Sequence, residues 1–105
     1  MEIKFDREYL RELYEVGKTT DKKYRFQPQT VAKYQKTVGI LKSVSRVEDL
    51  FLYNGLRYEA SHGDREGSES VRVNDKYRIE FKTTKIASET VVTICNIIEL
   101  SNYYK

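Results

Sequence analysis

The side chains best suited to chemistry lie in the last half of the chain. Arg72 and Arg78 fall in two short runs of alternating polar and apolar residues. A guanidinium is planar and always charged, so it can grip two oxygens of one phosphate or carboxylate. His62, the one histidine, lies in a polar stretch among glycines. Because imidazole titrates near neutral pH, His62 could move a proton or act as a cation.

Each of these residues also has a simpler explanation. A lone histidine in a glycine-rich polar loop, such as His62, is more often a bystander than a catalytic group. Arg78 could merely pair with a nearby carboxylate, such as Glu80 or Glu69, on an exposed sheet face. Arg65 could either bind phosphate or hold its own loop through the neighbouring acids. Sequence chemistry alone leaves these alternatives open.

A strongly basic segment runs from Val16 to Arg46. It holds eight basic residues against one acid, Asp21, for a local charge of +7, whereas the whole chain carries +3 and the remainder therefore −4. Such a stripe is typical of polyanion binding, because each neutralised phosphate releases counterions. A solvated, lysine-rich helix face has the same composition, and charge alone favours that simpler interpretation. The basic residues are Lys18, Lys22, Lys23, Arg25, Lys33, Lys36, Lys42 and Arg46.

The composition narrows the class of protein. With 105 residues, 39% hydrophobic and 33% charged, we expect one folded, soluble domain that spans residues 1–105. No apolar run approaches the ~20 residues that cross a bilayer, and the first residues have no export signal, so we expect a cytoplasmic protein without membrane contact. Cys95 and His62 are too few ligands for a zinc site, and a single cysteine closes no internal disulfide. We therefore expect no metal and no cofactor.

The first half of the chain predicts one strand and two helices. Residues 2–6 alternate as in a short strand, and Asp6 can cap a helix that ends at Gly17. Residues 18–27 read as a basic loop. Pro28 suits the first turn of a second helix, whose apolar residues recur at steps of three and four. These apolar residues are Val31, Tyr34, Val38, Leu41 and Val44.

The second half predicts a sheet. Ser45 and Glu48 have the spacing of a capping box for a short helix, and a glycine-containing loop follows. Residues 71–73 and 77–81 alternate around a polar turn, as in a hairpin. The run 90–100 is apolar at nearly every residue and predicts a central strand buried on both faces. The fold class is therefore α+β, with two helices packed on an antiparallel sheet.

The segment HGDREGSESVRVNDKYRIEF, from His62 to Phe81, resembles the signature of the RelE/ParE toxin superfamily. The similarity is greatest to its HigB-like branch, the plasmid maintenance system killer proteins. It extends to the last segment, TICNIIELSNYYK, and in pattern to the two helices. The implied fold, an N-terminal strand and helical hairpin on a C-terminal antiparallel sheet, agrees with the order of elements above.

The resemblance implies the toxin of a type II toxin–antitoxin system that cuts mRNA at the ribosomal A site. This reaction needs a base for the 2′-hydroxyl proton, cations for the phosphorane charge and an acid for the leaving oxygen, and it needs no metal. The family places a basic residue where His62 stands, as acid, base or cation. The resemblance makes Arg78 the phosphate-clamping arginine, and Arg72 and Arg65 are candidates for RNA binding.

The end of the chain departs from the family pattern. Related toxins commonly end in an acid or amide, an aromatic residue and a histidine, and here Asn102, Tyr103 and Tyr104 fall at these positions. Tyr103 could stack on a codon base, and Tyr104 could replace the histidine as proton donor. With a pKa near ~10, tyrosine is a poor base at neutral pH. The site could also be weakened or inactive, or both tyrosines could simply pack against the last strand.

Three functions from different classes remain. In the first, an endoribonuclease, ribosomal RNA contacts the basic segment. In the second, a ParE-like toxin inhibits DNA gyrase through its helical hairpin without catalysis. In the third, a degenerate relative only binds its antitoxin. The expected partners are a HigA-like helix-turn-helix antitoxin, operator DNA through that antitoxin, and the ribosome with its mRNA. The residues assigned to ribosomal RNA are Lys22, Lys23, Lys33, Lys36 and Arg46.

Overall fold

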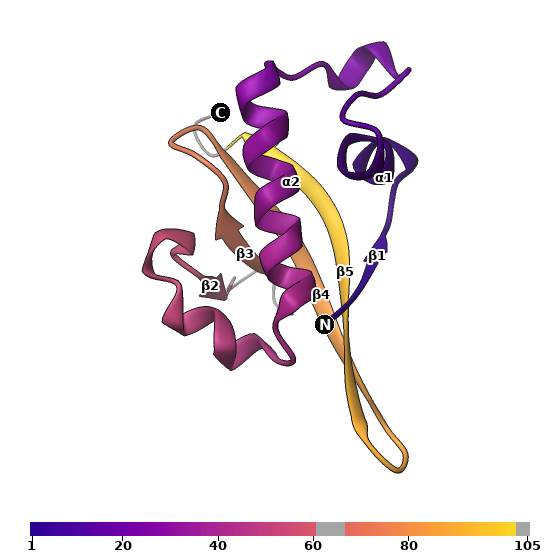
Figure 1. Ribbon diagram of the computed structural model, residues 1–105, viewed down its shortest axis with the longest axis vertical. Helices are drawn as coiled ribbons and strands as arrows, with labels where there is room; N and C mark the ends of the chain where they lie inside the picture. The colour runs from indigo at the N-terminus through magenta and orange to yellow at the C-terminus, as the bar shows by residue number, and fades with distance from the viewer. Residues whose placement is uncertain (61–66, 103–105) are drawn as a thin grey trace.

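The computed structural model describes residues 1–60 and 67–102 of the chain (Figure 1). Within these residues, five strands and two α-helices are joined by three short 3-10 helices, η1 to η3. The strands are β1 (Glu2–Phe5), β2 (Glu59–Ala60), β3 (Glu69–Arg72), β4 (Tyr77–Ala87) and β5 (Val91–Asn102). The helices are α1 (Glu8–Glu15), η1 (Lys22–Tyr24), α2 (Pro28–Ser43), η2 (Val47–Leu52) and η3 (Asn54–Leu56).

The described strands form one mixed sheet in the order β1-β5-β4-β3-β2. The pairs from β2 to β5 are antiparallel, which confirms the predicted antiparallel sheet of the second half. The edge strand β1 instead pairs with β5 in parallel, with Ile3 across from Cys95. Parallel pairing requires a long connection between the two strands, and here α1 and α2 both lie between β1 and β5 in the sequence. The predicted α+β class is confirmed.

The two α-helices pack on one face of this sheet. Figure 1 shows α2 running across the strands, with α1 beside it near β1 and β5. Leu10 of α1, Leu41 of α2 and Phe81 of β4 are fully buried in one core. Tyr34 is also fully buried, and its hydroxyl donates a hydrogen bond of 2.8 Å to the carbonyl of Leu10. Because Leu10 belongs to α1 and Tyr34 to α2, this bond joins the two helices. It also satisfies the one polar atom of the Tyr34 side chain inside the core.

The prediction that β5 is buried on both faces is wrong. Its residues alternate between buried and more exposed positions over much of the strand, and its first residues are exposed. Figure 1 shows why, because the β4–β5 hairpin extends well beyond the other strands and the helices. Val91 is 66% exposed and Ile86 52% exposed in this part of the hairpin. An apolar run predicts a strand, but burial depends on whether another element covers it.

Two of the predicted helix caps are also wrong. The side chain of Asp6 does not cap α1, whose N-cap is Arg7. The amide of Asp6 instead donates to the carbonyl of Ile97 at 2.8 Å, so the chain is still held by the sheet at this residue. In the predicted capping box, Asp49 rather than Glu48 accepts the hydrogen bond from the amide of Ser45.

Other local predictions are confirmed. Pro28 is in the first turn of α2, and Gly17 follows α1 with a φ of 91°. A left-handed residue is a common way to end a helix, and glycine adopts it without steric cost. In the turn between β3 and β4, the side-chain oxygen of Asn74 accepts hydrogen bonds from the amides of Lys76 and Tyr77. This local bonding fixes the turn.

Candidate functional site

Arg78 lies on the face of the sheet opposite the face that packs on the helices. Successive residues of a strand point to opposite faces, and Ile79 is fully buried in the helix-covered core. In the ladder between β3 and β4, Arg78 pairs with Arg72 and Glu80 pairs with Ser70. Because directly paired residues share a face, the two arginines and Ser70 lie together.

Hydrogen bonds to Ser70 and to the backbone of Arg57 hold the guanidinium of Arg78. Its Nε donates to the Ser70 hydroxyl at 3.1 Å, and its Nη2 donates to the carbonyls of Arg57 at 2.6 Å and Ser70 at 3.3 Å. The residue is only 6% exposed. A buried cation is costly unless it is well bonded, and these contacts supply part of that compensation. They also fix the orientation of the guanidinium.

A carboxylate that no sequence pattern predicted lies beside this guanidinium. The Oε2 of Glu59 is 3.8 Å from the Nη2 of Arg78, and the Glu59 side chain is 56% exposed. Glu59 belongs to the two-residue strand β2, where it pairs with Ser70. The sequence predicted only loop here, since two residues are too few to show an alternating pattern. The pairing with β3 alone brings Glu59 to Arg78.

Of the two carboxylates suggested as simple partners of Arg78, Glu69 and Glu80, only Glu80 lies on the same face of the sheet. Glu69 accepts hydrogen bonds from the hydroxyls of Tyr58 at 2.5 Å and Thr83 at 2.9 Å. It pairs with Phe81, so it lies on the helix-covered side, away from Arg78. Burial, followed by the hydrogen bond to Glu69, raises the pKa of Tyr58 above its ordinary value. Glu80 shares the face of Arg78, as expected, and is buried.

Arg72 is the second cation of this face. It is half-buried and forms an ion pair with Asp75, whose side chain is almost fully exposed. Because exposed ion pairs contribute little to stability, the pair with Asp75 leaves Arg72 able to bind another anion. The prediction that Arg72 and Arg78 are neighbours on adjacent strands is confirmed by the β3–β4 register.

Several predicted site residues cannot be placed beside Arg78. His62, Arg65, Tyr103 and Tyr104 lie outside the described residues. Asn102 is described, and it pairs with Tyr77 at the end of β5. By the alternation of the strands, it lies on the side of Ile79 rather than that of Arg78.

The predicted RNA-binding cations do not form one cluster. Lys22 and Lys23 lie in η1, before the start of α2, and Arg46 lies beyond its end. The 16 residues of α2, a helix about 24 Å long, lie between these groups in the sequence. Lys33 and Lys36 lie between them, on one exposed side of α2, and line a cavity together with Arg72. The structure therefore joins three of the predicted cations and separates the others.

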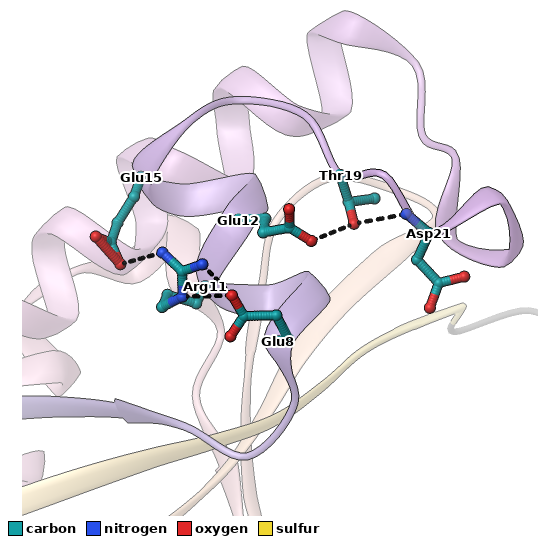
Figure 2. A network of polar contacts seen from close by, with 6 residues as sticks. All are labelled: Glu8, Arg11, Glu12, Glu15, Thr19 and Asp21. Carbon is teal, nitrogen blue, oxygen red and sulfur yellow. Dashed lines mark hydrogen bonds and ion pairs between the residues drawn. The ribbon is translucent and has the colours of Figure 1, made fainter.

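The charges on α1 are largely paired with one another. Figure 2 shows Arg11 between Glu8 and Glu15, bonded to both. The hydrogen bond from Arg11 lowers the pKa of Glu8. At the end of the helix, the Thr19 hydroxyl donates to Glu12 at 2.9 Å. These contacts keep the acidic groups of α1 in place beside the basic η1.

Cys95 and potential ligands give no further site. Cys95 is fully buried, as the core assignment predicted, and burial raises the pKa of its thiol to about 12. Within residues 1–60 and 67–102, no three His, Cys, Asp or Glu side chains gather in a way that could hold a metal ion. None of the described helices is both long and apolar enough to cross a membrane.

Comparison with known proteins shows a similarity of structure. No protein-family model matches this chain, and no curated protein sequence matches it. Among solved structures, it is similar to a YoeB/ParE toxin from Agrobacterium tumefaciens, with a TM-score of 0.56 and 16% identity over 99% of this chain and 100% of that one. A mutant of YafQ from E. coli gives a TM-score of 0.49 and 11% identity over 97% and 92%.

The first of these similarities identifies the fold. Nearly the whole of both chains is covered, so the arrangement of strands and helices is shared rather than a single motif. The predicted RelE-like α+β fold is thereby confirmed. The assignment to the HigB-like branch stays a prediction that depends on the motif between His62 and Phe81.

Proposed function

We propose that this chain is the toxin of a type II toxin–antitoxin system and cleaves mRNA on the ribosome without a metal. The observation that supports this most is the pair formed by Glu59 and Arg78, a half-exposed carboxylate beside a fixed guanidinium. The shared fold with a YoeB/ParE toxin and the motif from His62 to Phe81 support the same assignment.

The pair has the two functions that the first step of cleavage requires. In this step, Glu59 takes the proton of the 2′-hydroxyl, and the freed oxygen attacks the adjacent phosphorus. Arg78 stabilises the negative charge that develops on the phosphorane oxygens. The leaving 5′-oxygen needs a proton, for which His62 and Tyr104 are the candidates. Tyr103 is proposed to stack on a base, and Arg65 to bind the RNA. Asn102 lies on the other side of the sheet, so it is proposed to contact only RNA that passes the end of β5.

The burial of Arg78 suits this role. A charge in a partly dry environment acts more strongly than the same charge in water. The bonds to Ser70 and the Arg57 carbonyl hold the guanidinium in one orientation before the substrate binds. Groups that need no rearrangement during the reaction give the largest electrostatic stabilisation.

Expression in a bacterium tests this function. We expect the wild type to arrest growth and to leave new 5′ ends within codons of translated messages. Arg78→Ala should relieve the arrest and remove these ends, whereas Lys82→Ala, at an exposed site on the same strand, should retain both. Arrest with intact messages would contradict the nuclease.

The low exposure of Arg78 also fits a second function. A guanidinium that only ties β3 and the Arg57 carbonyl, just before β2, to β4 would be buried in the same way. The chain would then be a ParE-like inhibitor of DNA gyrase, or a relative that binds only its antitoxin. Inhibition of gyrase supercoiling by the purified chain would support the former, and its absence together with intact RNA would leave the latter.

The proposed partners follow from this function. They are a helix-turn-helix antitoxin of the HigA type, operator DNA through that antitoxin, and the ribosome with its mRNA, all in the cytoplasm. Lys22, Lys23 and Arg46 are proposed to contact ribosomal RNA. Because these cations lie at both ends of α2, they would contact separate phosphates rather than one.

A further inference from the structure

A cavity of about 390 Å³ opens between α2, η3 and the end of β3. Three cations line it, namely Lys33, Lys36 and Arg72, and no carboxylate is among its described lining residues. Its volume lies within the range of pockets that hold small molecules. The cavity is therefore a concave, positively charged site that the proposed catalytic pair does not use.

The rest of the lining suits a flat, partly apolar group. Leu56 and Val73 are buried and, with Ile40, give the cavity an apolar floor. Tyr53 forms a wall and is 42% exposed. Within the described residues, the Tyr53 hydroxyl has no hydrogen-bond partner and its ring stacks on no other aromatic ring. Such a ring offers a face to an incoming planar group.

The cations are available to a ligand. Lys33 and Lys36 are exposed, and neither forms an ion pair within residues 1–60 and 67–102. Arg72 pairs with Asp75, but this carboxylate is almost fully in solvent, so an anion in the cavity can compete for the guanidinium. Three cations around one opening attract a phosphate more strongly than any of them would alone.

We propose that this cavity binds a nucleotide, with its base against Tyr53 and its phosphate among Lys33, Lys36 and Arg72. Planar aromatic groups and phosphates occur together in nucleotides, and this explains why the apolar floor and the basic rim are adjacent. The nucleotide can be free or part of a single-stranded RNA. Arg72 lies directly across from Arg78 on the neighbouring strand, so one RNA strand could reach both the cavity and the catalytic pair. The inference goes beyond the proposed nuclease and does not require cleavage.

The test is a binding titration with two probes. One is a short, fluorescently labelled single-stranded RNA with 2′-O-methyl groups, which cannot be cleaved by 2′-hydroxyl attack, and the other is AMP. We expect the purified chain to bind the RNA, and to bind AMP as well if free nucleotides are ligands. Binding of RNA alone would assign the cavity to a strand. Binding of neither would overturn the proposal.

Variants assign the binding to this cavity. Tyr53→Ala should weaken binding about tenfold through lost stacking, whereas Tyr53→Phe should retain it. Removal of Lys33 and Lys36 should lower the slope of log affinity against log salt by roughly 0.7 for each lysine. Tyr53→Ala should leave this slope unchanged, which separates stacking from charge.

Lys42→Ala is the matched control, since Lys42 is exposed on the same helix but outside the cavity. Its effect on the affinity should be much smaller than that of either cavity lysine. All these side chains are exposed, and circular dichroism should show the same folded state for every variant. Equal losses for Lys33→Ala, Lys36→Ala and Lys42→Ala would mean diffuse attraction to a basic helix and would overturn the proposal.

Discussion

The carboxylate of Glu59 lies 3.8 Å from the Nη2 of Arg78, although the two residues are 19 positions apart in the sequence. Strand β2 brings them together, because Glu59 pairs with Ser70 and Ser70 bonds to Arg78. The proposed cleavage depends on this carboxylate and this guanidinium acting together on one phosphodiester. The two side chains differ in exposure, because Glu59 is half-exposed and Arg78 is buried.

The hydroxyl of Ser70 is expected to position Arg78. Ser70→Ala removes the acceptor of the Nε–H and should lower the free energy of unfolding by about 1 to 3 kcal/mol, because Ser70 and Arg78 are buried. Cleavage should fall through kcat rather than KM if the guanidinium acts in the transition state. Ser43→Ala, at an exposed serine, is the control and should change neither. An unchanged kcat for Ser70→Ala would remove Ser70 from the site.

The link between the two helices is expected to depend on one hydroxyl. Tyr34→Phe removes the hydrogen bond to the Leu10 carbonyl and should lower the free energy of unfolding by about 1 kcal/mol. Tyr53→Phe removes a hydroxyl without a partner in the described residues, so urea unfolding should not distinguish it from the wild type. Equal stabilities for the two variants would contradict the role of this bond.

The buried thiol predicts a loss of stability at alkaline pH. Burial raises the pKa of Cys95 from about 9 to about 12 in the folded chain. Below pH 9 the thiol is neutral in both states. Above it the unfolded chain loses the proton first, so stability falls with rising pH, by up to about 1.4 kcal/mol per unit.

Urea unfolding between pH 8 and 9.5 measures this effect while most tyrosines, with an ordinary pKa near ~10, are still protonated. Cys95→Ala should show a smaller decrease over the same range, whatever its stability at pH 8. A decrease of equal size in both proteins would show that other groups cause it.

The exposed hairpin predicts a contrast between two valines. Val91→Ala, near the end of the β4–β5 hairpin, should change the free energy of unfolding by less than about 0.5 kcal/mol. Val71→Ala, in the core on β3, should lower it by about 2 kcal/mol. Thermal or urea unfolding of both variants checks this. A large loss for Val91→Ala would mean that the hairpin is covered by another chain in solution.

The sequence predicted those elements whose residues carry their own local signal. Pro28 and the three-and-four spacing of apolar residues marked α2, and Asn74 marked the turn of the hairpin. Burial of β5 was not predictable in this way, because it depends on how far the helices reach along the strand. The same holds for the caps, where Asp49 rather than Glu48 bonds to Ser45.

In the candidate site, too, the residues with a local sequence signal could be predicted and those placed by packing could not. Arg78 and Arg72 could be found because they alternate with apolar residues in a hairpin, and the register confirms that they are neighbours. Glu59 could not be found, since its two-residue strand has no periodicity and its partner Ser70 is distant in sequence. The cavity beside Tyr53 likewise exists only after α2, η3 and β3 are packed together.

The rate of mRNA cleavage by Glu59→Gln tests the central claim most directly. This change keeps the shape of the side chain and removes its ability to take a proton. On programmed ribosomes in a single turnover, we expect cleavage to fall about 10²- to 10⁴-fold, as for the loss of a general base. The free energy of unfolding should change by less than about 1 kcal/mol, because Glu59 is half-exposed. Cleavage at the wild-type rate by a folded Glu59→Gln protein would contradict the account.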